Sequence, residues 1–431
     1  MSAAGRAPGD GPARRRPSIS TSMVAVLAVA AIVFAATVLR QTGIPKIETL
    51  WAEDGAVFLQ CDYEQGLLGC LGPYQGYLHL VPRLIGAAAG IVPPEAAPGT
   101  MAILAALVAA VAAAVAARAI IDGTSSSLAG LLGGIGLGLV WQAGREVLGN
   151  ATNVHWVLLC AATIAIVCSW LGARISLWTI GLVALTGLTS AFAPLIAVLA
   201  AAAVALHRPR ARPLLLVASG TAFIQLIVEL TSPRAVSPAD AVTLGAVLRF
   251  LRDEVIGRGF FGDVPMPAGL VVPVLIVVAL AGVALVERDR RLAIRAVIAV
   301  GALVVTGLAL CVASIILNRV MNPRYAYLPT SMMVAALALA GGLLAGALRR
   351  RSPTVGRWAP MLLPLIVAVV GVGFALSFRL EARASTGPDV PVEIRALIGC
   401  PAGSSATIII SPMRATNPWL MKIPCSRLVA P

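Results

Sequence analysis

The chain alternates long apolar runs with short polar segments, and the apolar runs set its expected architecture. Eleven of them have the composition of membrane-spanning helices, which need about 20 residues to cross a hydrocarbon core of about 30 Å. The pattern therefore predicts an all-α polytopic membrane protein with about 11 transmembrane helices. The runs cover residues 22–40, 96–118, 125–142, 156–172, 176–189, 192–206, 213–230, 268–286, 293–317, 327–348 and 358–378.

The runs 176–189 and 192–206 are each short for a bilayer, and joining them into one helix would invert the topology of all later segments. Charge decides between these two readings. With eleven crossings, the segments on the N-terminal side of the membrane carry 17 basic and four acidic residues, and the opposite side carries 16 basic and 15 acidic residues. Cytoplasmic loops are enriched in Lys and Arg. We therefore expect a cytoplasmic N-terminus and a C-terminus outside.

The composition agrees with a membrane protein and excludes a typical soluble one. Hydrophobic residues make up 59% of the chain, charged residues 12%, and the mean hydropathy is +0.91, whereas a soluble domain has roughly a quarter charged residues. The net charge of +14 reflects arginine-rich loops rather than binding of nucleic acid. The excess of Ala, Val, Gly and Arg is typical of a GC-rich bacterium, which predicts the bacterial cytoplasmic membrane as the location.

Outside the spans, the sequence predicts three parts. Residues 1–21 are too polar to fold alone and form a disordered cytoplasmic arm. The membrane module covers residues 22–378, and its first run could be a signal peptide but is long and lacks a clear cleavage site. Its first outer loop is 41–95, in which the apolar run 78–92 forms a juxtamembrane or partly inserted helix. The outer tail 379–431 contains a β-branched run and forms a small strand-containing cap.

Four cysteines fall on the predicted outer side. Cys61 and Cys70 lie in the first outer loop, and Cys400 and Cys425 lie in the C-terminal tail. An oxidising compartment favours two disulfides, for which we expect the local pairs although the sequence leaves the connectivity open. A zinc site is less favoured, because the chain has no C-x-x-C motif and only three histidines.

The first outer loop also carries an adjacent acid pair, Glu53 and Asp54, between Trp51 and Gly55. A carboxylate there could act as a general base toward an acceptor hydroxyl or help to hold a divalent cation. The alternatives are a solvated acid pair or a cap for a helix that starts at Gly55. No other cofactor is indicated.

The same loop continues into Tyr77, His79 and Arg83. At helical spacing His79 and Arg83 share a face, and such a basic face suits a lipid phosphate that Arg can bind with two hydrogen bonds. The alternative is an interfacial belt of aromatic and snorkelling basic side chains.

Two further outer segments contain candidate binding residues. Asn153 and His155 precede Trp156 in the second outer loop, which has more hydrogen-bonding groups than a turn requires and enough to contact a sugar. Trp156 is either a stacking platform or an interfacial anchor. Arg324 stands directly before the run 327–348 and is either an anion ligand or a flanking arginine.

Several functional classes lack their motifs in this sequence. There is no P-loop, no G-x-S-x-G, no H-E-x-x-H and no dinucleotide fingerprint. Ion-coupled transporters keep charged side chains near the middle of their spans, and these spans contain almost none. The sequence therefore does not favour an ion-coupled transporter.

The arrangement of these features resembles the GT-C superfamily, the multi-spanning glycosyltransferases that use polyprenyl-phosphate-linked sugars. The first outer loop with its acid pair and the arginine before a late helix carry this resemblance. Shorter motifs are similar to those of an uncharacterised bacterial family often placed beside these enzymes. They are residues 51–55, 76–80 with Pro82 and Arg83, and 148–150 with Asn153, His155 and Trp156.

The resemblance implies an inverting glycosyltransferase that moves a sugar from a polyprenyl-phosphate sugar lipid to an acceptor on the outer face, in cell-envelope synthesis. Asp54 matches the position of the first-loop catalytic acid, with Glu53 as its neighbour in reserve. Arg324 matches the phosphate-binding arginine, and Arg83 assists it. The order of the acids is reversed relative to the mannosyltransferases, and the outer tail is smaller than in many members. A non-catalytic carrier of lipid-linked saccharides, or an accessory subunit, is the alternative.

Overall fold

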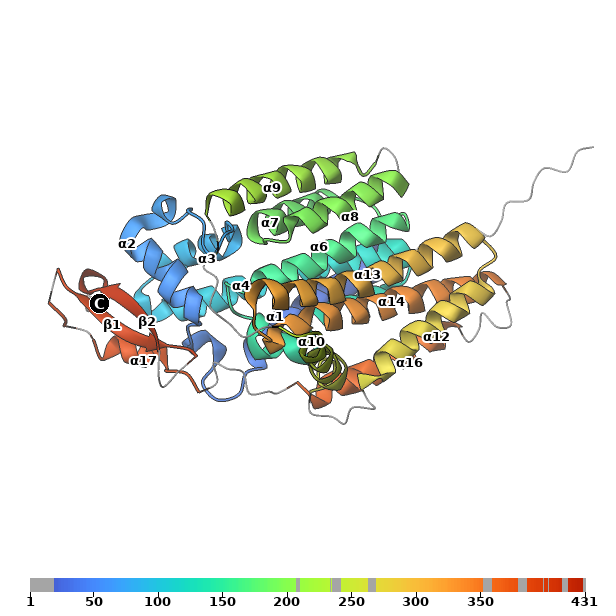
Figure 1. Cartoon of the computed structure of the whole chain (residues 1–431). Helices are drawn as coiled ribbons and strands as arrows, with labels where there is room; N and C mark the ends of the chain where they lie inside the picture. Colours follow the sequence, from blue (N-terminus) through green and yellow to red (C-terminus); the bar gives the residue numbers. More distant parts are fainter. Residues whose placement is uncertain are drawn as a thin grey trace, which may run out of the picture.

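The computed structural model describes residues 19–206, 210–232, 234, 242–262, 269–351, 359–378, 386–397, 399–401, 403–412 and 418–428. Most of the N-terminal arm that the sequence predicts lies outside these residues. Within them, the chain is a bundle of long helices with a small extramembrane part at one end (Figure 1).

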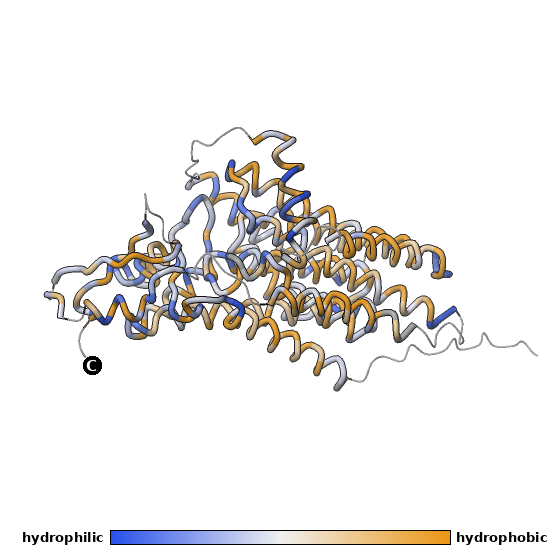
Figure 2. The backbone as a smooth tube through the Cα atoms, turned by 90° about the horizontal axis from the view of Figure 1, so that it is seen from below, coloured by the Kyte–Doolittle hydropathy of each residue, from blue (hydrophilic) through white to orange (hydrophobic). Residues whose placement is uncertain are grey.

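The eleven predicted spans are confirmed as helices within the described residues, with ends that differ by a few residues. Five are long and apolar enough to cross a membrane by themselves, and the others are shorter apolar helices. Figure 2 shows that hydrophobic residues follow the helices along most of their length. The protein is thus a multi-pass membrane protein. The helices are Ile19–Leu39 (α1), Ala97–Thr124 (α4), Ser127–Leu139 (α5), Val154–Trp170 (α6), Leu177–Thr189 (α7), Ala193–Leu206 (α8), Arg212–Thr231 (α9), Val271–Val286 (α12), Arg290–Asn318 (α13), Tyr327–Arg351 (α14) and Ala359–Leu376 (α16).

Two of these helices form the centre of the bundle. Every residue of α6 is buried, and α14 is buried from its first residue to Ala345. Small residues allow the neighbouring helices to approach closely, as is common between membrane helices. In α5, a Cβ on Gly134 would lie 2.7 Å from Val29 of α1, and one on Gly136 would lie 2.7 Å from Val334 of α14.

A buried arginine joins three helix ends. Arg40, directly after α1, is 1% exposed. Its guanidinium donates hydrogen bonds to the carbonyl oxygens of Gly138 (2.8 Å) and Val140 (3.2 Å) at the end of α5 and of Ser377 (3.1 Å) and Phe378 (3.0 Å) after α16. The side chain therefore satisfies carbonyls that the helix ends leave without intrahelical donors.

The first loop and the C-terminal tail lie together at one end of the helix bundle (Figure 1). The loop contains the π-helix Asp54–Leu59 (η2) and the helices Gln60–Gly69 (α2) and Leu80–Gly90 (α3). The tail contains the helix Val390–Arg395 (α17) and the antiparallel strands Ser405–Ile410 (β1) and Trp419–Pro424 (β2), with Ser405 opposite Pro424 and Ile410 opposite Trp419. The helix predicted in the run 78–92 and the strands predicted in the tail are thus confirmed.

The β-hairpin packs directly on the first loop. The backbone N–H of Ser411 donates to the carbonyl oxygen of Leu50 at 3.0 Å. Gly55 lies so close to the hairpin that a Cβ there would be 2.6 Å from Cδ1 of Ile410. Both predicted disulfides form, Cys61–Cys70 in the loop and Cys400–Cys425 in the tail.

The remaining short helices connect the spans. Leu244–Phe250 (α10) runs into the π-helix Leu251–Gly257 (η5) between α9 and α12. Ala143–Val147 (η4) precedes α6, and the 3-10 turn Pro323–Ala326 (η6) precedes α14. Lys46–Glu48 (η1), Pro94–Ala96 (η3) and Cys425–Arg427 (η7) are further 3-10 turns.

Candidate active site

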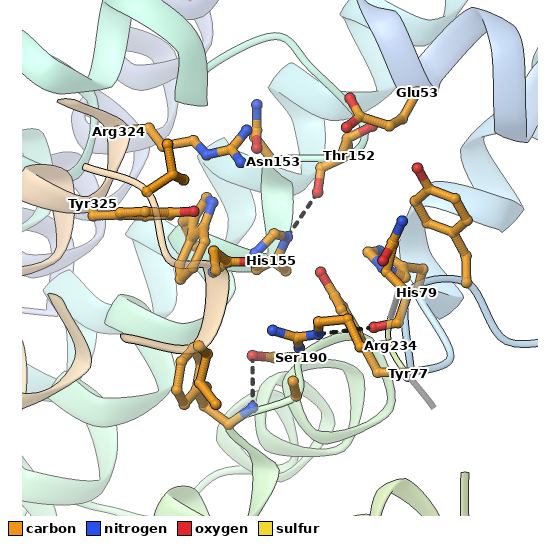
Figure 3. A pocket seen from close by; sticks show the side chains of 18 residues that line it. Glu53, Tyr77, His79, Thr152, Asn153, His155, Ser190, Arg234, Arg324 and Tyr325 are labelled. Carbon is orange, nitrogen blue, oxygen red and sulfur yellow. Dashed lines mark hydrogen bonds between the residues drawn. The ribbon is translucent and has the colours of Figure 1, made fainter. Parts of the chain in front are cut away.

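A cavity of about 280 Å³ lies at the end of the bundle that carries the first loop. Figure 3 shows its walls, which come from the first loop, the turns before α6 and α8, the segment after α9, and the segment between α13 and α14. The lining residues are Glu53, Tyr74, Gln75, Tyr77, His79, Thr152, Asn153, His155, Trp156, Ser190, Ala191, Phe192, Arg234, Leu317, Asn318, Val320, Arg324 and Tyr325.

The two central helices position one wall. Asn153, His155 and Trp156 stand at the start of α6, and Arg324 and Tyr325 form the turn η6 immediately before α14. Both helices are buried almost throughout, so these side chains are attached to the centre of the bundle. Such a support is what a binding or catalytic site needs.

The acid pair is divided between two environments. Adjacent residues of a helix point about 100° apart, so that Glu53 lines the cavity while Asp54 does not. The Oδ2 of Asp54 accepts a hydrogen bond from the Ala151 N–H (2.9 Å), and its Oδ1 accepts from the N–H (2.7 Å) and Oγ1 (2.5 Å) of Thr152. Asp54 therefore fixes the turn that leads into α6, and its predicted catalytic role stays a prediction.

The environment of Asp54 also changes its acidity. Its side chain is 2% exposed, and burial raises the pKa of its carboxyl from 3.8 to about 6. The hydrogen bonds from Thr152 and Ala151, and the charge of Lys46, act in the opposite direction.

A buried polar network lies behind the same wall. The Lys46 Nζ donates to Asn150 Oδ1 at 2.5 Å, and the Nδ2 atoms of Asn150 (2.5 Å) and Asn153 (2.8 Å) both donate to the carbonyl oxygen of Glu146. Burial lowers the pKa of Lys46 to about 8, and the charges of Asp54 and Glu146 oppose this. The network holds the amide of Asn153 in place at the cavity.

Gly149 is required for this packing. Its φ is +74°, a backbone conformation that residues other than glycine rarely adopt. A Cβ at this position would also lie 2.6 Å from Cε of Lys46.

His155 has a defined protonation pattern when it is neutral. Its Nδ1 lies 2.7 Å from the carbonyl oxygen of Thr152, and because a carbonyl can only accept, Nδ1 is the protonated nitrogen and Nε2 is left as an acceptor. The ring of the neighbouring Trp156 packs edge-on against Tyr325, with 5.8 Å between ring centroids. Trp156 is buried in the wall, so it is not an interfacial anchor.

A tight turn of the first loop forms the opposite wall. Tyr74 and Tyr77 exchange two backbone hydrogen bonds, of 3.0 and 3.2 Å, around Gln75 (φ 51°) and Gly76 (φ 81°). Positive φ at both central residues is the geometry of a type I′ turn. The turn places the Tyr77 ring against the ring of His79, with 3.6 Å between the centroids.

His79 is uncharged at neutral pH. It is 1% exposed, and burial lowers the pKa of its ring well below the usual value, with further lowering by the charges of His155, Arg83 and Arg234. The wall made by Tyr77 and His79 is therefore aromatic and neutral.

Arg83 lies outside the cavity lining, and its predicted part in phosphate binding stays a prediction. Its Nε donates to the Leu78 carbonyl oxygen at 3.1 Å and its Nη1 donates to that of Cys70. The guanidinium also lies over the ring of Phe58, 5.6 Å from the centroid. Its donors thus hold the first loop together.

Arg234 lines the cavity and was not among the residues that the sequence indicated. It follows the end of α9, and its Nε donates to the carbonyl oxygen of Gln75 at 3.2 Å. In the sequence, Arg234 cannot be distinguished from the arginines that commonly flank the end of a span. Its place at the cavity follows only from the packing of the end of α9 beside the first loop.

No metal site is evident in the described part of the chain. Among these residues, no group of three or more His, Cys, Asp or Glu side chains could hold a metal ion. Within that part of the molecule, the charged side chains that line the cavity are Glu53, Arg234 and Arg324.

No protein-family model matches the sequence, and no curated protein matches it. Among solved structures, the chain is similar to the oligosaccharyltransferase of Archaeoglobus fulgidus in its complex with zinc and sulfate, at 15% identity over 88% of this chain and a TM-score of 0.44. It is similar to the same protein tethered to an acceptor peptide with an NVT sequon, at 13% identity over 90% of this chain and a TM-score of 0.46. The chain spans 56% and 58% of the length of those two chains.

Proposed function

We propose that the protein is an inverting GT-C-type membrane glycosyltransferase that moves a sugar from a polyprenyl-phosphate donor to an acceptor hydroxyl. One observation carries the proposal. A carboxylate from the first loop, Glu53, and a guanidinium before a late helix, Arg324, line the same cavity. In Figure 3 they flank Asn153. The reaction needs a base for the acceptor and a fixed cation for the leaving phosphate.

The reaction follows from these two groups. The acceptor oxygen forms a bond to the sugar C1 while the C1–O bond to the phosphate breaks and its electron pair stays on the phosphate. Glu53 takes the proton of the acceptor hydroxyl, and Arg324 stabilises the charge that develops on the leaving group. A general base of this kind contributes about 10²–10⁴ to a rate.

Asp54 acts indirectly in this proposal. Its three hydrogen bonds to residues 151 and 152 hold the turn on which Asn153 and His155 stand. Asn153 and the Nε2 of His155 bind sugar hydroxyls, and Tyr77 and Trp156 provide ring faces for the sugar. Glu53 replaces Asp54 as the proposed base, because only Glu53 lines the cavity.

The distribution of charged residues gives the proposed orientation. The positive-inside rule places the N-terminus in the bacterial cytoplasm. The first loop, the cavity and the C-terminal hairpin then face outward, where lipid-linked sugars serve cell-envelope synthesis and where the two disulfides persist.

The test compares Glu53→Gln and Arg324→Gln with the control Glu48→Gln, an acid of the same loop outside the cavity. Each variant is expressed in the native host from which the gene has been deleted, and envelope glycans and lipid-linked sugars are measured by mass spectrometry. We expect Glu53→Gln and Arg324→Gln to lose the glycan product at normal protein levels and to accumulate the lipid-linked sugar, while Glu48→Gln keeps the product. If both cavity variants make normal product, the proposal is wrong. If lipid transport alone is lost, the protein is a carrier.

A further inference from the structure

The arginine that follows α9 has no task in the mechanism above. Arg234 lines the cavity together with Arg324, which is the proposed ligand of the leaving phosphate. Figure 3 shows His155 between the two guanidiniums. Arg234 therefore lies on the other side of the cavity from the phosphate, and its charge needs a separate explanation.

Arg234 is held so that one edge of its guanidinium is left for a ligand. Its Nε donates to the carbonyl oxygen of Gln75 at 3.2 Å, and its guanidinium carbon lies 5.7 Å from the centroid of the Tyr77 ring. Its two Nη atoms make no hydrogen bond or ion pair with another described residue. These two nitrogens form a planar fork that can bind both oxygens of one carboxylate.

The first-loop turn beside Arg234 is fixed to α9. The Leu78 N–H donates to Oε1 of Gln225 at 3.2 Å. A Cβ on Gly76 would lie 3.3 Å from the carbonyl oxygen of Ser232, so the turn approaches the end of α9 this closely because residue 76 is glycine. Arg234 thus belongs to a preformed wall of the cavity.

Two further groups that line the cavity can hydrogen-bond to a ligand. Ser190 is fully buried, and its Oγ accepts from the Phe192 N–H at 3.2 Å, which leaves the hydroxyl proton free to donate. Both residues directly precede α8, and the N-terminal end of a helix favours negative charge. Neither ring nitrogen of the buried His79 has a protein partner of good geometry among the described residues. Buried polar atoms of this kind are suited to a bound polar ligand.

The size of the cavity assigns Arg234 to the transferred sugar. Its volume of about 280 Å³ lies at the lower end of the range for small-molecule pockets, about 300–1,000 Å³. One sugar ring and the ends of the groups joined to it therefore occupy most of the space. A sugar that contacts Tyr77 also reaches Arg234, because the guanidinium lies over the same ring.

A neutral sugar would leave the charge of Arg234 uncompensated. Among the described lining residues, Glu53 is the one carboxylate, and in Figure 3 it lies across the cavity from Arg234. Two guanidiniums around so small a cavity repel each other unless anions lie beside them. A carboxylate on the sugar removes this repulsion. Such a carboxylate also needs a cation, because Glu53 and the donor phosphate are both negative.

We infer, on the basis of the proposed function, that the transferred sugar is a uronic acid whose carboxylate pairs with Arg234, so that Arg234 selects the donor sugar. The carboxylate takes no part in bond making. The acceptor oxygen forms the bond to C1, the phosphate leaves with the electron pair of the broken bond, and Glu53 takes the proton. Arg234 holds the far end of the sugar while C1 is placed between Glu53 and Arg324.

The first test measures binding of D-glucuronate, D-galacturonate and D-mannuronate to the purified full-length protein in dodecylmaltoside by saturation-transfer NMR. The matched neutral sugars are D-glucose, D-galactose and D-mannose. We expect the wild type to bind at least one uronate about tenfold more tightly than its neutral counterpart, and Arg234→Gln to lose this preference. Arg234→Lys should keep part of it, because lysine keeps the charge without the fork. The control Arg252→Gln, on an exposed arginine outside the cavity, should keep all of it.

The second test identifies the sugar itself. Under the proposed function, the host strain that carries Glu53→Gln accumulates the lipid-linked sugar, and mass spectrometry of its lipid extract gives the mass of that sugar. We expect the mass of a hexuronic acid and not that of a hexose.

The outcomes separate this inference from the proposed function. A neutral sugar on the accumulated lipid overturns the inference and leaves the proposed function intact. If that sugar is neutral but the wild type still prefers uronates and Arg234→Gln does not, the carboxylate belongs to the acceptor and the assignment to the donor is wrong. A wild type without preference for any uronate, or an equal preference in Arg234→Gln, also overturns the inference. Normal glycan product from Glu53→Gln overturns the proposed function instead, on which the binding measurement does not depend.

Discussion

Replacing Asp54 with asparagine tests the burial of its carboxyl through the dependence of stability on pH. The pKa of Asp54 is raised from 3.8 to about 6 in the folded protein. Between these values the folded state binds a proton that the unfolded state has lost. The stability from this proton is fully present below about pH 4 and is lost as the pH rises through 6.

The size of the effect follows from the same values. One pKa unit corresponds to 1.36 kcal/mol, so the shift of Asp54 corresponds to about 3 kcal/mol. Asparagine does not titrate. Its Nδ2 is a hydrogen-bond donor and would face the N–H groups that donate to the carboxylate of Asp54 in the wild type. The variant is therefore less stable than the wild type at pH 4. We expect this difference in the free energy of unfolding to shrink by about 3 kcal/mol between pH 4 and pH 7.

The assay is unfolding by SDS titration in mixed dodecylmaltoside micelles, followed by circular dichroism at several pH values. Lys46 does not contribute in this range, because its pKa is about 8. The control is Asp253→Asn, since Asp253 is exposed and its hydrogen bond with Arg252 lowers its pKa, which gives the opposite sign. A difference for Asp54→Asn that stays constant or grows from pH 4 to pH 7 would refute the burial of this carboxyl.

Two further substitutions test the packing around the site. Arg40→Met leaves four carbonyl oxygens without their donor, which should lower the free energy of unfolding by about 2–4 kcal/mol. The stability of Arg40→Lys should fall between those of the wild type and Arg40→Met. An unchanged thermal midpoint of Arg40→Met in detergent would contradict this. Gly149→Ala meets both backbone strain and the Lys46 side chain, whereas Gly172→Ala, at φ +90° with open space around it, meets strain alone. We expect Gly149→Ala to cost about 1–3 kcal/mol more than Gly172→Ala, measured by the same titration, and equal losses would show that the contact with Lys46 is not tight.

Much of the fold could be predicted from the sequence, because a bilayer imposes simple rules. Each crossing must be an apolar helix of limited length, so the eleven runs indicate the helices almost directly. The division into 176–189 and 192–206 needed the additional evidence of charge, and the helices α7 and α8 confirm it within the described residues. The local disulfide pairs followed from the position of each cysteine in the predicted topology.

The site could be predicted only in part. The sequence indicated the polar segments that meet at the cavity, since few polar residues occur outside the spans. It could not decide between Glu53 and Asp54, because the direction of each side chain depends on a π-helix that no periodicity in six residues reveals. The hydrogen bonds of Arg83 go to backbone carbonyls of its own loop, and such contacts leave no trace in side-chain patterns.

The attachment of the β-hairpin to the first loop has a consequence for biogenesis. Ile410 and Met421 support the glycine two residues after Glu53, yet they follow every apolar helix along the chain. During synthesis, the acid-bearing loop reaches its compartment long before its supporting hairpin exists. The proposed catalytic carboxylate therefore gains its final support only after the last of these helices has been made, so a nascent chain halted before that point would carry the loop without its supporting hairpin.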